Sequence, residues 1–539
     1  MKPQPPVTRM RIDPRTSSDA EAAPLVSPPT VGSRIDALLG RASTMDWTPW
    51  LIIGLGAFLR LFLLGIKPPH FDEGINGWFV DQMVKNGFYR YDPTNYHGPL
   101  HFYILFLAQT LFGRNVWAIR LPVVLASIFS IHLTTKFEPF VGRNVSRLAA
   151  LAMAVSPGFV FYGRYSIHEV WLLLFSMLFI LGLLGLWQKG TVNYLWCTGM
   201  GLAGMILTKE TYIIHVGCAA IAVVVAWVSH KINPMKETQR VRQTWTSIDL
   251  LVVAAAGLAA IIFFYSGAFL NWPGVAGLFK TFAAWFKTGS EGAGHEKDWW
   301  YWLMLIARYE QPILVGTVVC VVCQFFLRNL AIRYLAIYGV GTLIAYSIVK
   351  YKTPWCIISI VWPMIFTFGA LLALARAEFQ RAVSIGAAIL LAASLWMCVR
   401  LNYFRCTTDT EPYVYVQTYN DVWKLTGPLL RLARANPTYY QLVGHLIRTS
   451  TYPLPWMLGD FTKVGYYEHN NMPDKLDADF LVVQEDKIEE VEGKLRDTYF
   501  TEPFTIRPYQ DPSKLYLSAR VFSRLFPGRA PEFSGKQPN

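Results

Sequence analysis

Several acidic, basic and histidine side chains of this chain stand at the ends of long apolar stretches. Asp72 and Glu73 follow the first stretch, and Glu169 follows the third. Charges in or against a membrane are costly, so they mark a functional site by default. These three acids are the expected catalytic residues. The expected substrate-binding residues are Arg60, His97, His101, Arg164, His168, Lys209, Glu210, Lys350 and Lys352.

Carboxylates that face cations at the level of the lipid headgroups suit the transfer of a group from a lipid phosphate. A carboxylate can accept the proton of an acceptor hydroxyl as a general base, and we expect Asp72 in this role. Glu73 and Glu169 would then position the acceptor or support the base. Cations offset the charge that develops on a departing phosphate. The cations expected to hold it are Arg164, Lys209, Lys350 and Lys352.

The acidic residues also have structural interpretations. Asp72 and Glu73 would stabilise the N-terminus of a surface helix, because acids are favoured at that end. Glu169 would form an ion pair with Arg164, which lies five residues earlier. Neither interpretation is decided by the spacing alone.

The basic and histidine residues have structural interpretations as well. Lys209 would pair locally with Glu210, while Arg60, Lys350 and Lys352 would extend to the lipid headgroups. His97 and His101 are four residues apart, a spacing that fits a metal pair or an ordinary helix face. No metal ligand is assigned from this pair.

The composition places all these residues in a membrane protein. The chain has 539 residues, of which 53% are hydrophobic and 16% are charged; soluble domains carry about 25% charged residues. The net charge of +13 arises before Asn402, where 33 residues are basic and 19 are acidic. This distribution indicates membrane topology and argues against a nucleic-acid partner.

The apolar segments predict an all-α polytopic membrane protein with about eleven transmembrane helices. Segments 73–87 and 98–113 are amphipathic or short, and we expect them to be surface helices in the first outer loop. The predicted transmembrane helices lie near 49–66, 117–136, 147–163, 169–188, 194–208, 211–229, 248–269, 303–326, 330–349, 354–375 and 382–401.

With this count the basic loops face one side, which the positive-inside rule makes cytoplasmic. The N-terminus is then inside, and the acidic motifs converge near the outer leaflet. The 270–302 loop also lies outside, and its Gly289, Gly292 and Gly294 suggest a mobile lid.

Three domains are expected. Residues 1–46 are polar and proline-rich and predict a disordered cytoplasmic tail; residues 47–401 form the transmembrane domain; residues 402–539 form a small extracytoplasmic α/β domain. Within this last domain, strands are predicted at 413–417, 480–484 and 514–520, and helices at 419–435 and 485–496.

The acidic pair after the first span, the surface helix and the His97-Gly-Pro-Leu100 motif resemble the GT-C glycosyltransferases of the family 39/83 type. Within that superfamily, the protein O-mannosyltransferases and the lipid A aminoarabinose transferases are the most similar branches. The resemblance implies that Asp72 and Glu73 are the catalytic acidic pair and that Glu169 is the second acid. Leu207-Thr-Lys209 is similar to their Leu-Thr-Lys motif, and His97 stands where they have a lysine.

The segments 163–169, 351–355 and 452–456 are together similar to the flippase activity-associated membrane proteins of archaeal-type N-glycosylation. The resemblance implies a glycosyltransferase of the plasma (inner) membrane, surrounded by membrane lipids. It would transfer a sugar, with inversion, from a polyprenyl-phosphate-linked donor to a glycan, lipid or protein acceptor on the outer face. No firm cofactor is implied, because members of the superfamily differ in their use of a divalent cation.

Two other functions fit parts of the sequence. One is a non-catalytic accessory protein in the translocation of lipid-linked sugars. The other is a secondary transporter, although transporters place their charges at the midplane between repeats. Here the charges sit at one interface, and no internal repeat is evident.

Overall fold

The computed structural model describes residues 46–95, 97–232, 243–292, 294–468 and 471–535. The residues from Thr48 to Asn539 form one compact unit. Apart from Asp46, the predicted tail 1–46 lies outside the described residues. The division of the remainder at residue 402 stays a prediction.

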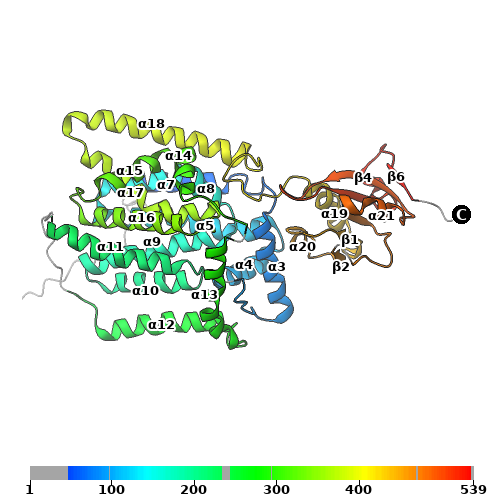
Figure 1. Ribbon diagram of the computed structural model, residues 1–539, viewed down its shortest axis with the longest axis horizontal. Coiled ribbons are helices and arrows are strands. Elements are labelled where there is room, and N and C mark those ends of the chain that lie inside the picture. The colour runs from blue at the N-terminus through cyan, green and yellow to red at the C-terminus, as the bar shows by residue number, and fades with distance from the viewer. Residues whose placement is uncertain (1–45, 96, 233–242, 293, 469–470, 536–539) are drawn as a thin grey trace, which may run out of the picture. The chain divides into compact units, whose positions relative to one another are not determined.

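Helices build the chain up to Val399, and each of the eleven predicted segments contains one (Figure 1). The helices are α2 (Thr48–Leu61), α3 (Phe71–Asn86), α4 (Leu100–Phe112), α5 (Val116–Thr135), α6 (Glu138–Val141), α7 (Arg143–Val155), α8 (Pro157–Gly163), α9 (His168–Gln188), α10 (Val192–Ile206), α11 (Tyr212–Ile232), α12 (Ser247–Tyr265), α13 (Pro273–Glu291), α14 (Tyr301–Tyr309), α15 (Gln311–Cys323), α16 (Leu330–Ile348), α17 (Ile357–Leu374) and α18 (Gln380–Val399).

Fewer helices than eleven meet the length and apolarity of a membrane span. Among the described residues seven helical stretches do so, and an eighth does if α7 and α8, which bend by 60° between them, count as one span. The predicted span 303–326 is interrupted at Glu310, where α14 ends and α15 begins. The apolar helices α2 and α15 are shorter than a full span.

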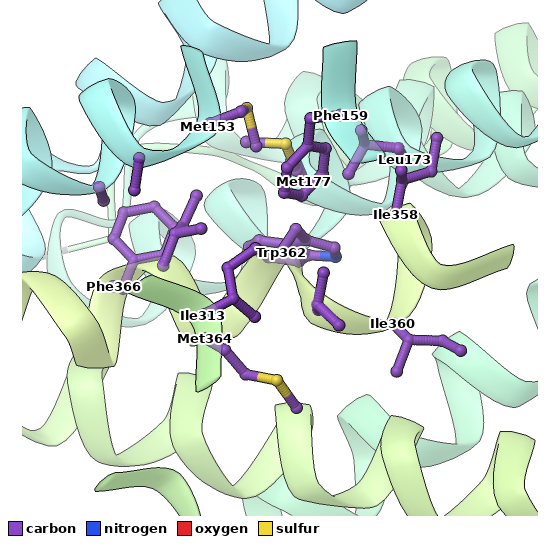
Figure 2. Close-up of a cluster of buried hydrophobic side chains, with 14 of the residues drawn as sticks. Met153, Phe159, Leu173, Met177, Ile313, Ile358, Ile360, Trp362, Met364 and Phe366 are labelled. Atoms are coloured by element: carbon purple, nitrogen blue, oxygen red, sulfur yellow. The ribbon is translucent and has the colours of Figure 1, made fainter. Parts of the chain in front are cut away.

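The core of the helical part lies around α17. In the most apolar 18 residues of the stretch that contains α17, 78% of the residues are buried, whereas in those of α12 only 6% are buried. In Figure 1, α12 and α18 lie at opposite edges of the helical part. Trp362 of α17 is fully buried, with Phe159 and Met177 on one side of its ring and Ile313 on the other (Figure 2). The central helices are thus held by side-chain packing, while α12 exposes an apolar surface suited to lipid.

The helices predicted at 73–87 and 98–113 are present as α3 and α4, and their place at the outer membrane surface stays a prediction. The segment 270–302, which was predicted to be a mobile loop, is largely helical. Residues 273–291 form α13, and Gly292 ends this helix with a left-handed backbone (φ 80°), which glycine adopts without steric cost. Beyond it, Glu296 pairs with Tyr351 in an isolated antiparallel bridge. This segment is therefore ordered against the 350–352 region.

The C-terminal domain contains a six-stranded mixed sheet in the order β2-β1-β3-β5-β4-β6. Its first three strands in that order are parallel and the others antiparallel. The strands are β1 (Val443–Ile447), β2 (Lys463–Tyr467), β3 (Phe480–Gln484), β4 (Thr498–Phe504), β5 (Ser513–Ser518) and β6 (Phe533–Ser534), and the α-helices are α19 (Val422–Ala435), α20 (Leu454–Met457), α21 (Ile488–Glu492) and α22 (Ala519–Phe522).

The predicted strands 480–484 and 514–520 are confirmed as β3 and β5, and the predicted helix 419–435 is confirmed as α19. The strand prediction for 413–417 is wrong. Tyr413 stacks on Tyr309 with ring centroids 4.2 Å apart, and its carbonyl accepts a hydrogen bond from Tyr162. The segment is apolar because it crosses the helical part.

The C-terminal domain docks on α3 and α4 through α20. Trp456 packs so closely on Gly77 of α3 that a Cβ at Gly77 would overlap the indole ring. Its Nε1 donates a hydrogen bond to Gln109 of α4 at 2.9 Å. Arg114, just beyond α4, donates to Asp460 at 2.9 Å. These contacts hold the sheet domain over the start of α3.

Candidate functional site

The start of α3 separates the two residues of the acidic pair. His70 is the N-cap: its Nδ1 accepts a hydrogen bond from the Asp72 amide, and its own amide donates to Glu73, which completes a capping box. The His70 Nε2 lies 2.8 Å from the carbonyl of Tyr415. Because a carbonyl can only accept, this nitrogen carries the proton. Both ring nitrogens are thus used to fix the helix start.

Glu73 points into the protein and not into a cavity. Its carboxylate forms a bidentate ion pair with Arg120 of α5, at 2.8 and 2.6 Å, and both side chains are fully buried. It also accepts from the amide of Ser166 at 2.9 Å. Burial raises the pKa of Glu73, but Arg120 outweighs this effect and lowers the pKa to about 2. Glu73 therefore does not line the cavity with Asp72, and its expected catalytic role stays a prediction.

Asp72 faces a cavity of about 590 Å³. Its side chain is 31% exposed, whereas that of His70 beside it is 2% exposed. Burial lowers the pKa of His70 to about 3, so this imidazole brings no positive charge to Asp72. Burial, and then the charge of Glu169, raise the pKa of Asp72 to about 6. A carboxylate with such a pKa is well suited to accept a proton near neutral pH.

Glu169 also lines this cavity, and its partner is Lys209. The expected alternative pairing of Glu169 with Arg164 is wrong. Arg164 instead donates to the backbone carbonyls of Leu59, Phe62 and Leu63 at the end of α2. Arg164 does not line the cavity, and its expected role as a phosphate ligand stays a prediction.

Glu210 accepts a hydrogen bond from His97 Nδ1 at 3.1 Å, so the expected local pair of Lys209 with Glu210 is not the contact that forms. Gly98 makes this approach possible. Its amide donates to the carbonyl of Thr208 at 3.0 Å, and an added Cβ would overlap the carbonyl of Leu207. The close backbone contact brings His97 and Glu210 to the same wall of the cavity.

The three histidines pack against one another as a cluster of tilted and edge-on rings. The ring of His168 lies 4.6 Å from that of His97 and 4.5 Å from that of His101, measured between centroids. Trp171 donates to His101 Nδ1 at 3.0 Å, so this nitrogen is not free to bind a metal ion. Among the described residues no three His, Cys, Asp or Glu side chains are arranged to hold one. His101 lies behind the cavity, while His97 and His168 line it.

Three further cations are placed away from the cavity wall. Arg60 is fully buried and donates to Ser127 at 2.7 Å, so it neither reaches the headgroups nor the cavity. Lys352 donates to the carbonyl of Lys297 at 3.0 Å and ties together the two segments that flank the cavity. Lys350 joins the same pairing through its backbone. Lys350, Lys352 and Arg60 therefore do not line the cavity, and their expected substrate contacts stay predictions.

The cavity thus collects six of the expected residues on one surface. They are Asp72, His97, His168, Glu169, Lys209 and Glu210. The cavity also has an aromatic and polar wall from α13 and the 350–356 region, and a wall from the C-terminal domain, whose residues were not among the expected site residues. These include Trp285, His295, Tyr351, Trp355, Arg507, Tyr509 and Gln510. Arg507 carries no sequence signal, because an arginine in a polar loop is usually a surface residue.

Comparisons with known proteins concern part of the sequence and the fold. The family model of the dolichyl-phosphate-mannose-protein mannosyltransferases matches residues 96–262. The fold is similar to that of ArnT from Cupriavidus metallidurans bound to undecaprenyl phosphate, with a TM-score of 0.58 and 14% identity, over 91% of this chain and 100% of that chain. The apo state of ArnT gives 0.55 and 13%, over 94% and 100%. No curated protein matches the chain.

The chain is therefore an integral membrane protein with the fold of the GT-C membrane glycosyltransferases. The resemblance to that superfamily, predicted from the acidic pair and the Gly-Pro-Leu motif, is confirmed. The narrower resemblance to the flippase activity-associated proteins stays a prediction.

Proposed function

We propose that this protein is a glycosyltransferase that takes a sugar from a polyprenyl-phosphate-linked donor. The observation that supports it most is the convergence of Asp72, the Glu169–Lys209 pair and the Glu210–His97 pair on one cavity. The fold adds support, since the similar ArnT structure was solved with undecaprenyl phosphate. A cavity of about 590 Å³ is within the usual size of small-molecule sites.

In the proposed reaction Asp72 accepts the proton of the acceptor hydroxyl while the hydroxyl oxygen bonds to the anomeric carbon. The bond from that carbon to the phosphate oxygen breaks, and the lipid phosphate leaves with the electron pair. The base and the leaving group lie on opposite faces, so the configuration inverts. Lys209 offsets charge on the phosphate, and Glu169 holds Lys209 in place and orients the acceptor. His97, His168 and Glu210 contact the sugar or acceptor.

The proposed acceptor is a glycan, a lipid or a protein on the outer face of the plasma membrane. The membrane helices and the C-terminal domain both contribute to the lining of the cavity. A polyprenyl tail can remain in the bilayer only if its phosphate is bound close to the membrane surface. Helix α13 is suited to this arrangement, since it exposes Phe279 and Phe286 while Trp285 lines the cavity.

The test is Asp72→Asn, which keeps the shape of the side chain but removes the proton acceptor. We expect glycan transfer in reconstituted membranes to fall by about 10²–10⁴-fold, with binding of undecaprenyl phosphate retained. Glu378→Gln is the matched control, because Glu378 is a surface carboxylate that is 64% exposed. Transfer by Asp72→Asn at the wild-type rate would refute the enzymatic proposal and favour an accessory role.

A further inference from the structure

The loop between β4 and β5 carries the C-terminal domain into the cavity. Arg507, Pro508, Tyr509 and Gln510 of this loop line the cavity together with Asp72. Two hydrogen bonds fix the first residues of the loop. The amide of Thr505 donates to Asp421 at 3.0 Å, and the carbonyl of Ile506 accepts from the amide of Tyr419 at 2.7 Å. The loop therefore presents Arg507 from a rigid base.

Arg507 lies against the residue that precedes the proposed base. Its guanidinium carbon is 3.8 Å from the centroid of the Phe71 ring, and its Nη2 donates to Ser450 Oγ at 3.1 Å. No Asp or Glu side chain of the described residues forms an ion pair with it. Among the described residues its Nε and Nη1 form no hydrogen bond, so these donors are left for another ligand.

A second arginine stands behind the first. Arg448 is only 3% exposed and donates to Ser513 at 2.9 Å and to Gln510 of the same loop at 3.1 Å. Its Nε is buried without a hydrogen-bond partner, and it too has no ion pair among the described residues. Burying charge without a counter-charge is costly. The two arginines thus form a positive site without an ion pair among the described residues, although the charge of Asp72 acts on Arg507 across the cavity.

Lys209 differs from this site, because its charge is already matched by Glu169. Lys209 can still offset part of the charge of a phosphate, but a cation without an ion pair offers more of its charge. Among the described residues of the cavity wall, Arg507 is such a cation. A guanidinium is also better shaped than an ammonium for two parallel hydrogen bonds to a phosphate.

We propose that Arg507, supplied by the C-terminal domain, binds a phosphate ester of the substrate inside the cavity. This inference rests on the proposed function, and it assigns the soluble domain a part of the substrate site. The phosphate comes from the lipid-linked donor or from a phosphate-bearing acceptor, which present the same chemistry to the guanidinium.

The experiment uses the full-length protein with Arg507→Gln and Arg507→Lys, and with Arg524→Gln as control, since Arg524 is an exposed arginine of the same domain. Binding of undecaprenyl phosphate is measured in lipid nanodiscs, and the rise in melting temperature with inorganic phosphate is measured in parallel. We expect Arg507→Gln to raise the Kd for undecaprenyl phosphate about tenfold or more, because charge-assisted bidentate hydrogen bonds are lost. Arg507→Lys should lie between this variant and the wild type.

Wild-type binding of undecaprenyl phosphate by Arg507→Gln, together with a raised KM for phosphate-bearing acceptors alone, would support the acceptor as the source. Wild-type values for lipid binding, acceptor KM and phosphate stabilisation would overturn the proposal. Failure of the proposed function is a separate result, since it requires that the wild-type protein itself transfer no sugar. The inorganic phosphate measurement still tests Arg507 in that case.

Discussion

Asp72 and Glu73 are neighbours in sequence, yet their surroundings push their pKa values in opposite directions. Arg120 lowers the pKa of Glu73 to about 2, while burial raises that of Asp72 from 3.8 to about 6. Asp72 must be deprotonated to accept a proton, so acid inactivates it. We expect kcat/KM for transfer to fall about tenfold per pH unit below pH 6 and to level off above it.

The measurement is a pH profile between 4.5 and 8 in reconstituted membranes, with Asp72→Asn run beside the wild type. The residual activity of this variant should lack the acidic limb. A midpoint near the ordinary aspartate value, or an unchanged limb in the variant, would contradict the assignment of Asp72 as the base.

At the scale of elements, the close contact of the 97–100 segment with the residues after α10 decides the shape of one wall of the cavity. Gly98→Ala would place a Cβ against the carbonyl of Leu207 and displace the hydrogen bond from Gly98 to Thr208. We expect it to destabilise the protein by about 1–3 kcal/mol. It should also lower transfer at least tenfold, because His97 would move away from Glu210. Thermal unfolding and transfer rates check both effects.

Gly386→Ala is the matched control for this variant. Gly386 lies within α18, where an added Cβ meets nothing within 4 Å. Alanine in a helix interior is favoured over glycine, so melting temperature and activity should be retained or slightly raised. Equal behaviour of Gly98→Ala and Gly386→Ala would show that the close backbone contact is not required.

At the scale of the whole molecule, the cavity lies at one end of the helical part. The N-terminus of α9 and the C-termini of α10 and α16 lie beside it. The opposite ends carry basic residues such as Arg143 and Arg333, which the positive-inside rule assigns to the cytoplasm. We predict that the cavity and the C-terminal domain are outside the cytoplasm.

A reporter that is active only outside the cytoplasm should therefore work when fused after Asn539. The same reporter inserted at Gly190, between α9 and α10, should be silent and serves as the control. The reverse pattern would invert the topology and place the proposed reaction on the cytoplasmic face.

The local signals of the chain were sufficient for its membrane class, for most of its helices, and for Asp72, Glu169 and Lys209 as parts of one site. Apolar runs of about 20 residues and charges at their ends are properties of short segments, so they can be recognised in the sequence without knowledge of the tertiary structure. The number of full spans was harder to predict, because breaks such as the one at Glu310 depend on what the helix ends contact.

Only the tertiary structure decided which expected residues reach the cavity. Glu73 is turned away by Arg120, which lies 47 residues later, and Arg60 and Arg164 are used by backbone and hydroxyl groups of other helices. Arg507 comes from the far end of the chain and meets Phe71 because α20 docks on α3. Ion pairing and burial depend on such long-range contacts, and no local pattern of residue types encodes them.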